Sequence, residues 1–100
     1  MEETRRTITM EELETIMTEK SAVFDACSVD TYGMSIDMLC TGCRFEKTDG
    51  SEYLAMILVN EPTEVQMDAS YIEEIYLDEE GTITIEFNVI LPDLEIKYRE

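Results

Sequence analysis

The sequence predicts an α+β fold in which one N-terminal amphipathic helix packs on an antiparallel sheet of five or six strands with hairpin or meander connections. Three observations lead to this class: a helix-start signal at 8–13, alternation of apolar and polar residues over 82–89, and an Asp-Gly pair between two β-rich runs at 49–50. With 44% apolar residues in 100, the chain is expected to form one small domain over 1–100, with 1–7 polar and frayed.

The helix is predicted from its first residues. Thr9 and Glu12 have the spacing of a capping box, in which each side chain accepts a hydrogen bond from the other's backbone amide. Ile8 and Leu13 occupy the positions of a hydrophobic staple, and the helix is expected to end near Lys20. Its apolar side is interpreted as a cover for one sheet face, with an exposed partner helix as the alternative.

Three strands are expected in the next part of the chain. The first spans 22–29, with Ala22, Phe24 and Ala26 on one face, and turn formers follow at 28–33. Residues 34–43 fit both a strand and a helix face, and we favour a strand because a hairpin follows at 44–59. Asp49 and Gly50 predict a type I′ turn, in which both residues need a positive φ. Within this hairpin, the apolar run 53–59 predicts a central strand covered on both faces.

The C-terminal half is predicted to contain three more strands. Pro62 ends the preceding strand, and 64–70 reads as a polar connection. Strands over 71–77 and 82–89 are joined by an acidic turn, and the second should have a buried face and a solvated face. Its apolar positions are Ile83, Ile85, Phe87 and Val89. The alternating residues of 94–98 predict a last strand at a sheet edge.

The charge is the outstanding property of the composition. Twenty-four acidic residues against seven basic ones give a net charge of −17, and no Lys or Arg occurs between Thr48 and Ile96. This charge disfavours direct contact with nucleic acid or an anionic membrane and favours a basic protein partner. The residues expected to form an acidic partner-binding patch are Glu73, Glu74, Asp78, Glu79, Glu80, Glu86, Glu61, Glu64 and Asp68.

Several kinds of chemistry are disfavoured. The chain has no histidine, so a histidine-activated nucleophile is excluded, and its four glycines form no phosphate-binding loop. We therefore expect no enzyme activity and no cofactor. Cys40 and Cys43 form a lone CxxC, and Cys27 is a third thiol. These are weak candidates for a metal or redox site, and plain thiols are the preferred interpretation because a zinc site needs four ligands.

Two functional hypotheses follow. The first is an inhibitor or adaptor that docks on a basic protein, such as a nuclease, as a nucleic-acid mimic of the type that mobile elements use against nucleases. The alternative is an accessory domain that forms a homodimer through an apolar surface, while its charge serves solubility. That surface would be the edge strand 94–98 or the methionines Met10, Met17, Met34, Met38, Met56 and Met67. Because no membrane span or signal peptide is predicted and the cysteine count is odd, we expect a cytoplasmic protein.

Overall fold

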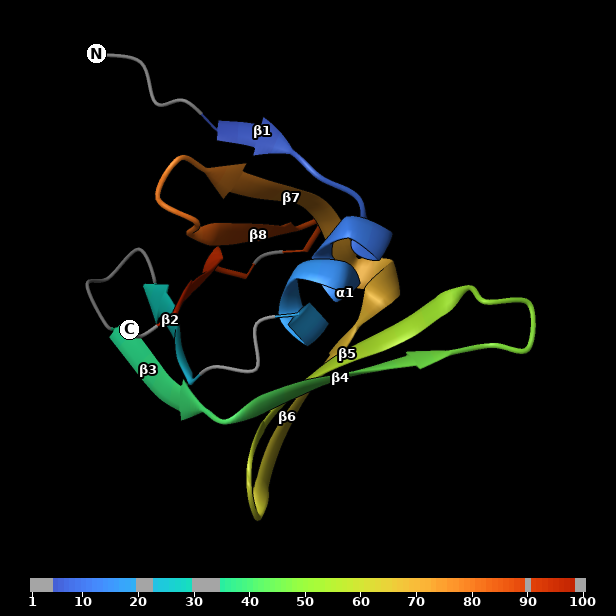
Figure 1. Cartoon of the computed structure of the whole chain (residues 1–100), viewed down its shortest axis with the longest axis horizontal. Coiled ribbons are helices and arrows are strands. Elements are labelled where there is room, and N and C mark those ends of the chain that lie inside the picture. Colours follow the sequence, from blue (N-terminus) through green and yellow to red (C-terminus); the bar gives the residue numbers. More distant parts are fainter. Residues whose placement is uncertain (1–4, 20–22, 30–34, 90, 99–100) are drawn as a thin grey trace.

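The computed structural model describes residues 5–19, 23–29, 35–89 and 91–98 (Figure 1). The predictions for Ala22, Lys20 and Met34, for residues 1–4 and for the turn at 30–33 lie outside these ranges. The elements are β1 (Arg5–Thr7), α1 (Met10–Glu19), β2 (Phe24–Val29), β3 (Ser35–Cys40), β4 (Gly42–Lys47), β5 (Tyr53–Asn60), β6 (Thr63–Asp68), the short 3₁₀ helix η1 (Ala69–Tyr71), β7 (Ile72–Asp78), β8 (Ile83–Phe87) and β9 (Leu94–Tyr98).

The predicted α+β class is confirmed, but the prediction of one sheet is wrong. A six-stranded sheet has the order β1-β7-β8-β9-β2-β3, and a separate three-stranded sheet has the order β4-β5-β6. All strand pairs are antiparallel. One core joins the two sheets and α1, and its buried residues are Ile8, Leu13, Met17, Phe24, Ala26, Cys40, Met56, Leu58, Ile75, Ile83, Ile85 and Ile96.

The start of α1 follows the prediction. The Glu12 amide donates to Thr9 Oγ1 at 3.1 Å, and both staple residues, Ile8 and Leu13, are buried. The Glu12 carboxylate, however, accepts from Arg6 Nη1 at 3.0 Å, so the second half of the capping box is replaced by an ion pair with β1. Only Leu13 and Met17 of this ten-residue helix are buried, so its apolar stripe is narrower than the predicted amphipathic face.

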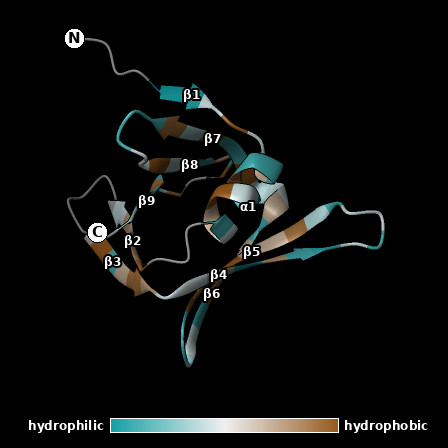
Figure 2. Ribbon diagram, viewed as in Figure 1, coloured by the Kyte–Doolittle hydropathy of each residue, from teal (hydrophilic) through white to brown (hydrophobic). Residues whose placement is uncertain are grey.

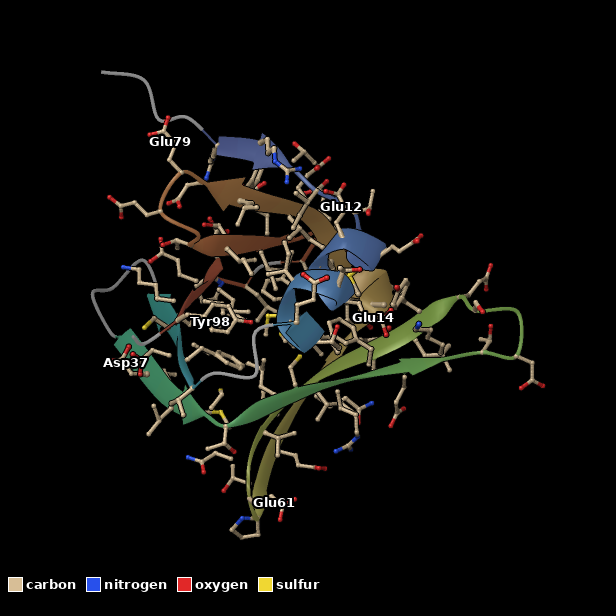
Figure 3. The ribbon with its side chains drawn as sticks, viewed as in Figure 1. Glu12, Glu14, Asp37, Glu61, Glu79 and Tyr98 are labelled. Carbon is tan, nitrogen blue, oxygen red and sulfur yellow. The ribbon has the colours of Figure 1, made fainter. Side chains whose placement is uncertain are left out.

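A hydrogen-bonded cluster of three side chains links α1 to the β4–β5 hairpin. Lys47 Nζ and Tyr53 Oη each donate to Glu14 Oε1 at 2.7 Å, and Glu14 is labelled beside this hairpin in Figure 3. The hydrogen bond from Lys47, followed by that from Tyr53, lowers the pKa of the Glu14 carboxyl. Each of the three side chains has its partner within the cluster, so we interpret the cluster as a contact that stabilises the fold and not as a functional site.

The described part of the ambiguous segment, 35–43, is extended on either side of residue 41, as we preferred, but it belongs to two strands in two sheets. The change of sheet occurs at Thr41, a bend between Cys40 and Gly42. The Thr41 amide donates to the Val59 carbonyl at 2.8 Å, so the pairing partner changes from β2 to β5 at this residue.

The prediction of a central strand at 53–59 is confirmed within the three-stranded sheet, but both faces are covered only over residues 55–58, since Leu54 is 51% exposed. Residues 55–58 of β5 are all buried, and β5 lies between β4 and β6. Met56 and Leu58 belong to the common core. On the opposite face, Arg44 of β4 and Glu64 of β6 form an ion pair at 2.6 Å across the central strand, next to Ile57.

Three predictions about polar or terminal segments are wrong. Residues 63–68 form β6, which pairs with β5, although 64–70 were predicted to be a connection. Residues 5–7 form β1, which pairs with β7, although the segment was predicted to be frayed and is hydrophilic in Figure 2. The strand 94–98 lies between β8 and β2 and is therefore not at an edge. Strand pairing uses backbone N–H and C=O groups, and every residue type except proline provides both. A polar strand at a sheet edge therefore leaves little trace in the pattern of side chains.

Two tight turns of the same geometry join β4 to β5 and β7 to β8. In the first, Ser51 N donates to the Thr48 carbonyl at 2.9 Å, and in the second, Gly81 N donates to the Asp78 carbonyl at 3.2 Å. The residue with positive φ is Ser51 in one turn (66°) and Gly81 in the other (87°). The predicted type I′ turn is therefore wrong, because neither Asp49 nor Gly50 has a positive φ.

This comparison predicts that Ser51→Gly stabilises the protein. A left-handed conformation costs a non-glycine residue about 1–2 kcal/mol, and the extra backbone entropy of glycine offsets about half of this gain. We expect the free energy of unfolding, measured by urea titration, to rise by about 0.5–1 kcal/mol. The reciprocal variant Gly81→Ser should lower it. An unchanged or lower stability of Ser51→Gly would contradict this account of the turn.

Candidate functional site

The face of the six-stranded sheet that points away from the core is the candidate site. Directly opposed residues in neighbouring strands share a face, so the registers define one row of side chains across five strands. From β7 to β3, this row is Tyr76, Thr84, Glu95, Cys27 and Asp37. The alternating residues of the same strands, such as Ile83 and Ile96, are buried in the core. The row therefore lies on the opposite side, which we call the outer face.

The outer face is predominantly acidic. Its six carboxylates, on five strands, are Asp25, Asp37, Glu74, Asp78, Glu86 and Glu95. The bases on the same face are Arg5, opposite Asp78, and Lys97, opposite Asp25. None of these eight side chains is buried. Among the described strand residues, the face is thus an open surface on which acids outnumber bases three to one.

The structure divides the predicted acidic patch into two groups. Glu73, Glu74, Asp78, Glu79, Glu80 and Glu86 lie on the β7–β8 hairpin, whereas Glu61, Glu64 and Asp68 lie on the β5–β6 hairpin. Glu79 and Glu61 are at opposite ends of the molecule in Figure 3. The nine residues therefore do not form one continuous surface.

Sequence reasoning missed three carboxylates of the outer face. Asp25, Asp37 and Glu95 lie on β2, β3 and β9, far in sequence from the β7–β8 hairpin. The signal that could have identified them is alternation, because each lies between two apolar residues of its strand, as Asp25 does between Phe24 and Ala26. Which strands neighbour one another could not be read from that pattern.

Four of the nine predicted residues have local structural roles. Asp78 Oδ1 accepts from the amides of Glu80 and Thr82 at 2.9 Å each and thereby shapes the β7–β8 turn. The remaining three are Glu64, which binds Arg44; Asp68, which accepts from Ser70; and Glu86, which accepts from Tyr76 Oη at 3.2 Å. The hydrogen bond with Arg44 lowers the pKa of the Glu64 carboxyl, and that from the Ser70 amide lowers the pKa of Asp68.

Like charges oppose one another on the outer face. Glu74 lies directly opposite Glu86 in the β7–β8 pair, an arrangement that destabilises a sheet. Cys27 lies in the middle of the face, and the pKa of its thiol is raised to about 11. The largest cause is a hydrogen bond with Asp37, and desolvation and the charge of Asp25 add to it. This electrostatic environment favours cations and cationic side chains over anions.

The three cysteines are not brought together as a ligand set. Cys40 is buried in the core, Cys43 packs against that core, and Cys27 lies on the outer face. Burial raises the pKa of Cys40, and it raises the pKa of Cys43 to about 12. The thiolate is the form that binds metals and attacks electrophiles, and this environment disfavours it. Within the described residues, no group of three or more His, Cys, Asp or Glu side chains is arranged to hold a metal ion.

The half-buried Cys43 thiol predicts a loss of stability at high pH. Its pKa is raised from 9.0 to about 12, so above pH 9 the unfolded chain loses this proton more readily than the folded one. The stabilisation is complete below pH 9 and disappears as the pH rises toward 12. We expect Cys43 to lower the free energy of unfolding by about 2 kcal/mol between pH 9 and pH 11.

Urea titrations across this pH range, with the variant Cys43→Ala as the comparison, measure the effect. The variant should lose about 2 kcal/mol less than the natural sequence over the same interval. Burial, followed by the charge of Cys43, raises the pKa of Tyr98 to about 12, so the Tyr98→Phe background, in which this second group is absent, should be used for both proteins. Identical pH dependence of the two proteins would contradict the assignment to Cys43.

Comparison with known proteins adds no assignment. No protein-family model, curated protein or solved structure matches the chain. Among the parts of the chain that are described, no helix has the length and apolar character needed to cross a bilayer.

The methionines within the described ranges do not form the adaptable surface considered above. Met17 and Met56 are buried in the core, and Met10, Met38 and Met67 pack against it with part of their surface. Five of the six methionines considered thus fill space inside the fold, which is the usual role of this flexible side chain, and Met34 lies outside the described ranges.

Proposed function

We propose that this protein is a non-enzymatic acidic binding protein, an inhibitor or adaptor, that docks through its outer face on the basic surface of a nucleic-acid-binding protein. The observation that carries the proposal is the gathering of six carboxylates from five strands on one open face. A nuclease groove, which binds phosphates with Lys and Arg, is the kind of surface that such a face fits.

The spacing of the sheet supports nucleic-acid mimicry. Alternate residues of one strand lie about 6.5–7 Å apart, which is close to the spacing of successive phosphates along a nucleic-acid strand. No described strand carries carboxylates at two successive outer-face positions, so a phosphate-like row must combine acids from several strands. Neighbouring strands lie about 4.8 Å apart, so charges from several strands can contact one basic groove. Tyr76 and Thr84 provide neutral polar surface between the carboxylates, and Glu79 and Glu80 extend the charge at the turn.

The repulsion between Glu74 and Glu86 also supports a binding role. A pair of like charges directly opposed in a sheet lowers stability, and a basic partner would relieve the repulsion on binding. Natural proteins commonly retain such unfavourable arrangements at functional surfaces.

Affinity capture from a cell lysate at low and high salt tests the proposal. With the purified protein as bait, basic nucleic-acid-binding proteins should be retained at low salt and released at high salt, because surface ion pairs are screened. Added duplex DNA should compete with the bait for the same proteins. Self-association alone, unchanged by salt, would contradict the proposal.

A further inference from the structure

The outer edge of β3 is a second feature of the same surface. Among the described strands, β3 ends the six-stranded sheet, and its one strand partner is β2. Asn60 Nδ2, from the other sheet, donates to the Leu39 carbonyl at 2.7 Å, which places that carbonyl on the side of β3 that faces away from β2. Because the backbone groups of alternate residues point to the same side, the N–H and C=O of Asp37 also lie on this edge.

The side chains of β3 define what could pair with this edge. Ile36 is 64% exposed and Leu39 is 40% exposed, although exposed apolar side chains on a sheet edge invite pairing with another strand. Asp37 lies on the outer face of the edge strand, and Asp25 lies on the outer face of the next strand. An added strand would therefore meet the Asp37 carboxylate and the exposed Leu39 side chain on the outer face, and the apolar side chain of Ile36 on the other.

We propose that the β3 edge binds an extended basic segment of the partner by antiparallel strand addition, with Lys or Arg side chains over Asp37 and apolar side chains beside Ile36. The proposal rests on the proposed function and specifies the partner segment as a strand of alternating basic and apolar residues. Backbone hydrogen bonds supply part of the affinity, and the carboxylates select the basic side chains.

The register makes a specific demand on this segment. Asp37 presents its side chain to the outer face and its backbone groups to the edge. In an antiparallel pair, the residue opposite Asp37 exchanges both backbone hydrogen bonds with it and has its side chain on the same face. The basic residues of the segment must therefore provide the N–H groups that bind β3, whereas the N–H groups of the apolar residues point away.

A pair of N-methylated peptides tests this demand. The probe is a fluorescent heptapeptide of alternating lysine and valine, and its binding is measured by anisotropy at low salt. Methylation of the lysine N–H groups should weaken binding about tenfold or more, because at least one pair of backbone bonds is lost. Methylation of the valine N–H groups, which leaves the same charge, should have little effect. Equal affinity of the two methylated peptides would overturn strand addition.

A glutamine–valine peptide separates this inference from the proposed function. Strand addition by a basic segment predicts that the glutamine–valine peptide binds weakly and that lysine–valine binding falls with salt. If the lysine N-methyl effect is absent while the charge and salt effects remain, the strand addition fails and the proposed function stands. If the glutamine–valine peptide binds as tightly as the lysine–valine peptide, the requirement for a basic partner fails.

A protein variant gives an independent measurement. Asp37→Pro removes the edge N–H and the carboxylate but no backbone group that pairs with β2, so it should abolish peptide binding. Asp37→Asn keeps the N–H and removes the charge, so it should retain the preference for the valine-methylated peptide at lower affinity. If circular dichroism shows that Asp37→Pro does not fold, hydrogen exchange of the natural protein replaces this variant. Strand addition predicts that the Asp37 amide exchanges more slowly when the peptide is added. Unchanged exchange would overturn the proposal.

Discussion

The triple variant Glu74→Gln, Glu86→Gln, Glu95→Gln should bind a basic partner up to about 100-fold more weakly than the natural protein and should also be more stable. Each exposed ion pair lost costs up to about 1 kcal/mol, so three together cost up to about 3 kcal/mol, or two factors of ten in the dissociation constant. The glutamines keep the size of the side chains and one acceptor oxygen each, so the shape of the outer face is retained.

The gain in stability has a separate physical cause. Glu74 and Glu86 are directly opposed, and removing this repulsion should raise the free energy of unfolding by about 0.2–1 kcal/mol. Loss of binding together with increased stability distinguishes a functional surface from a structural one, because damage to the fold would lower both quantities.

A matched control separates the position of the charges from their number. Glu46, Glu52 and Glu61 lie on the three-stranded sheet and its two turns, away from the outer face. Changing these three residues to glutamine alters the net charge by the same amount. The dissociation constants of the captured partner, measured by calorimetry at low salt, should differ only for the outer-face variant. Equal weakening by both variants would show that net charge alone governs binding.

Ile85→Ala should destabilise the fold by about 2–5 kcal/mol, a large part of the roughly 5–15 kcal/mol typical of a domain. Ile85 has no exposed surface, and its strand, β8, lies between β7 and β9 inside the six-stranded sheet. The side chain belongs to the core that joins both sheets and α1, so the cavity left by the alanine cannot be filled by solvent.

The neighbouring residue provides the control for this variant. Thr84 is in the same strand with its side chain on the outer face, so Thr84→Ala should change stability by only about 0.5 kcal/mol. Urea unfolding followed by circular dichroism measures both variants. A small effect of Ile85→Ala, comparable with that of Thr84→Ala, would contradict the assignment of the two sides of β8.

The sequence alone determined the features that depend on residues close together in the chain. The Thr9 cap and the Ile8–Leu13 staple identified the start of the helix, because each involves neighbours within one turn. Alternation identified the buried side of β8 through Ile83 and Ile85, because successive side chains of any strand point to opposite faces. It also identified residues 53–59 as a central strand, since only such a strand buries both faces.

The tertiary structure decided which strands neighbour one another. The switch of sheets at Thr41, the internal position of β9 and the pairing of the polar strands β1 and β6 depend on backbone hydrogen bonds, which are the same for nearly every residue type. The composition of the outer face depends on the same choice. Asp25 and Asp37 come beside Glu95 only because β2 pairs with both β3 and β9, and this long-range pairing is fixed by burial of one common core rather than by any local pattern.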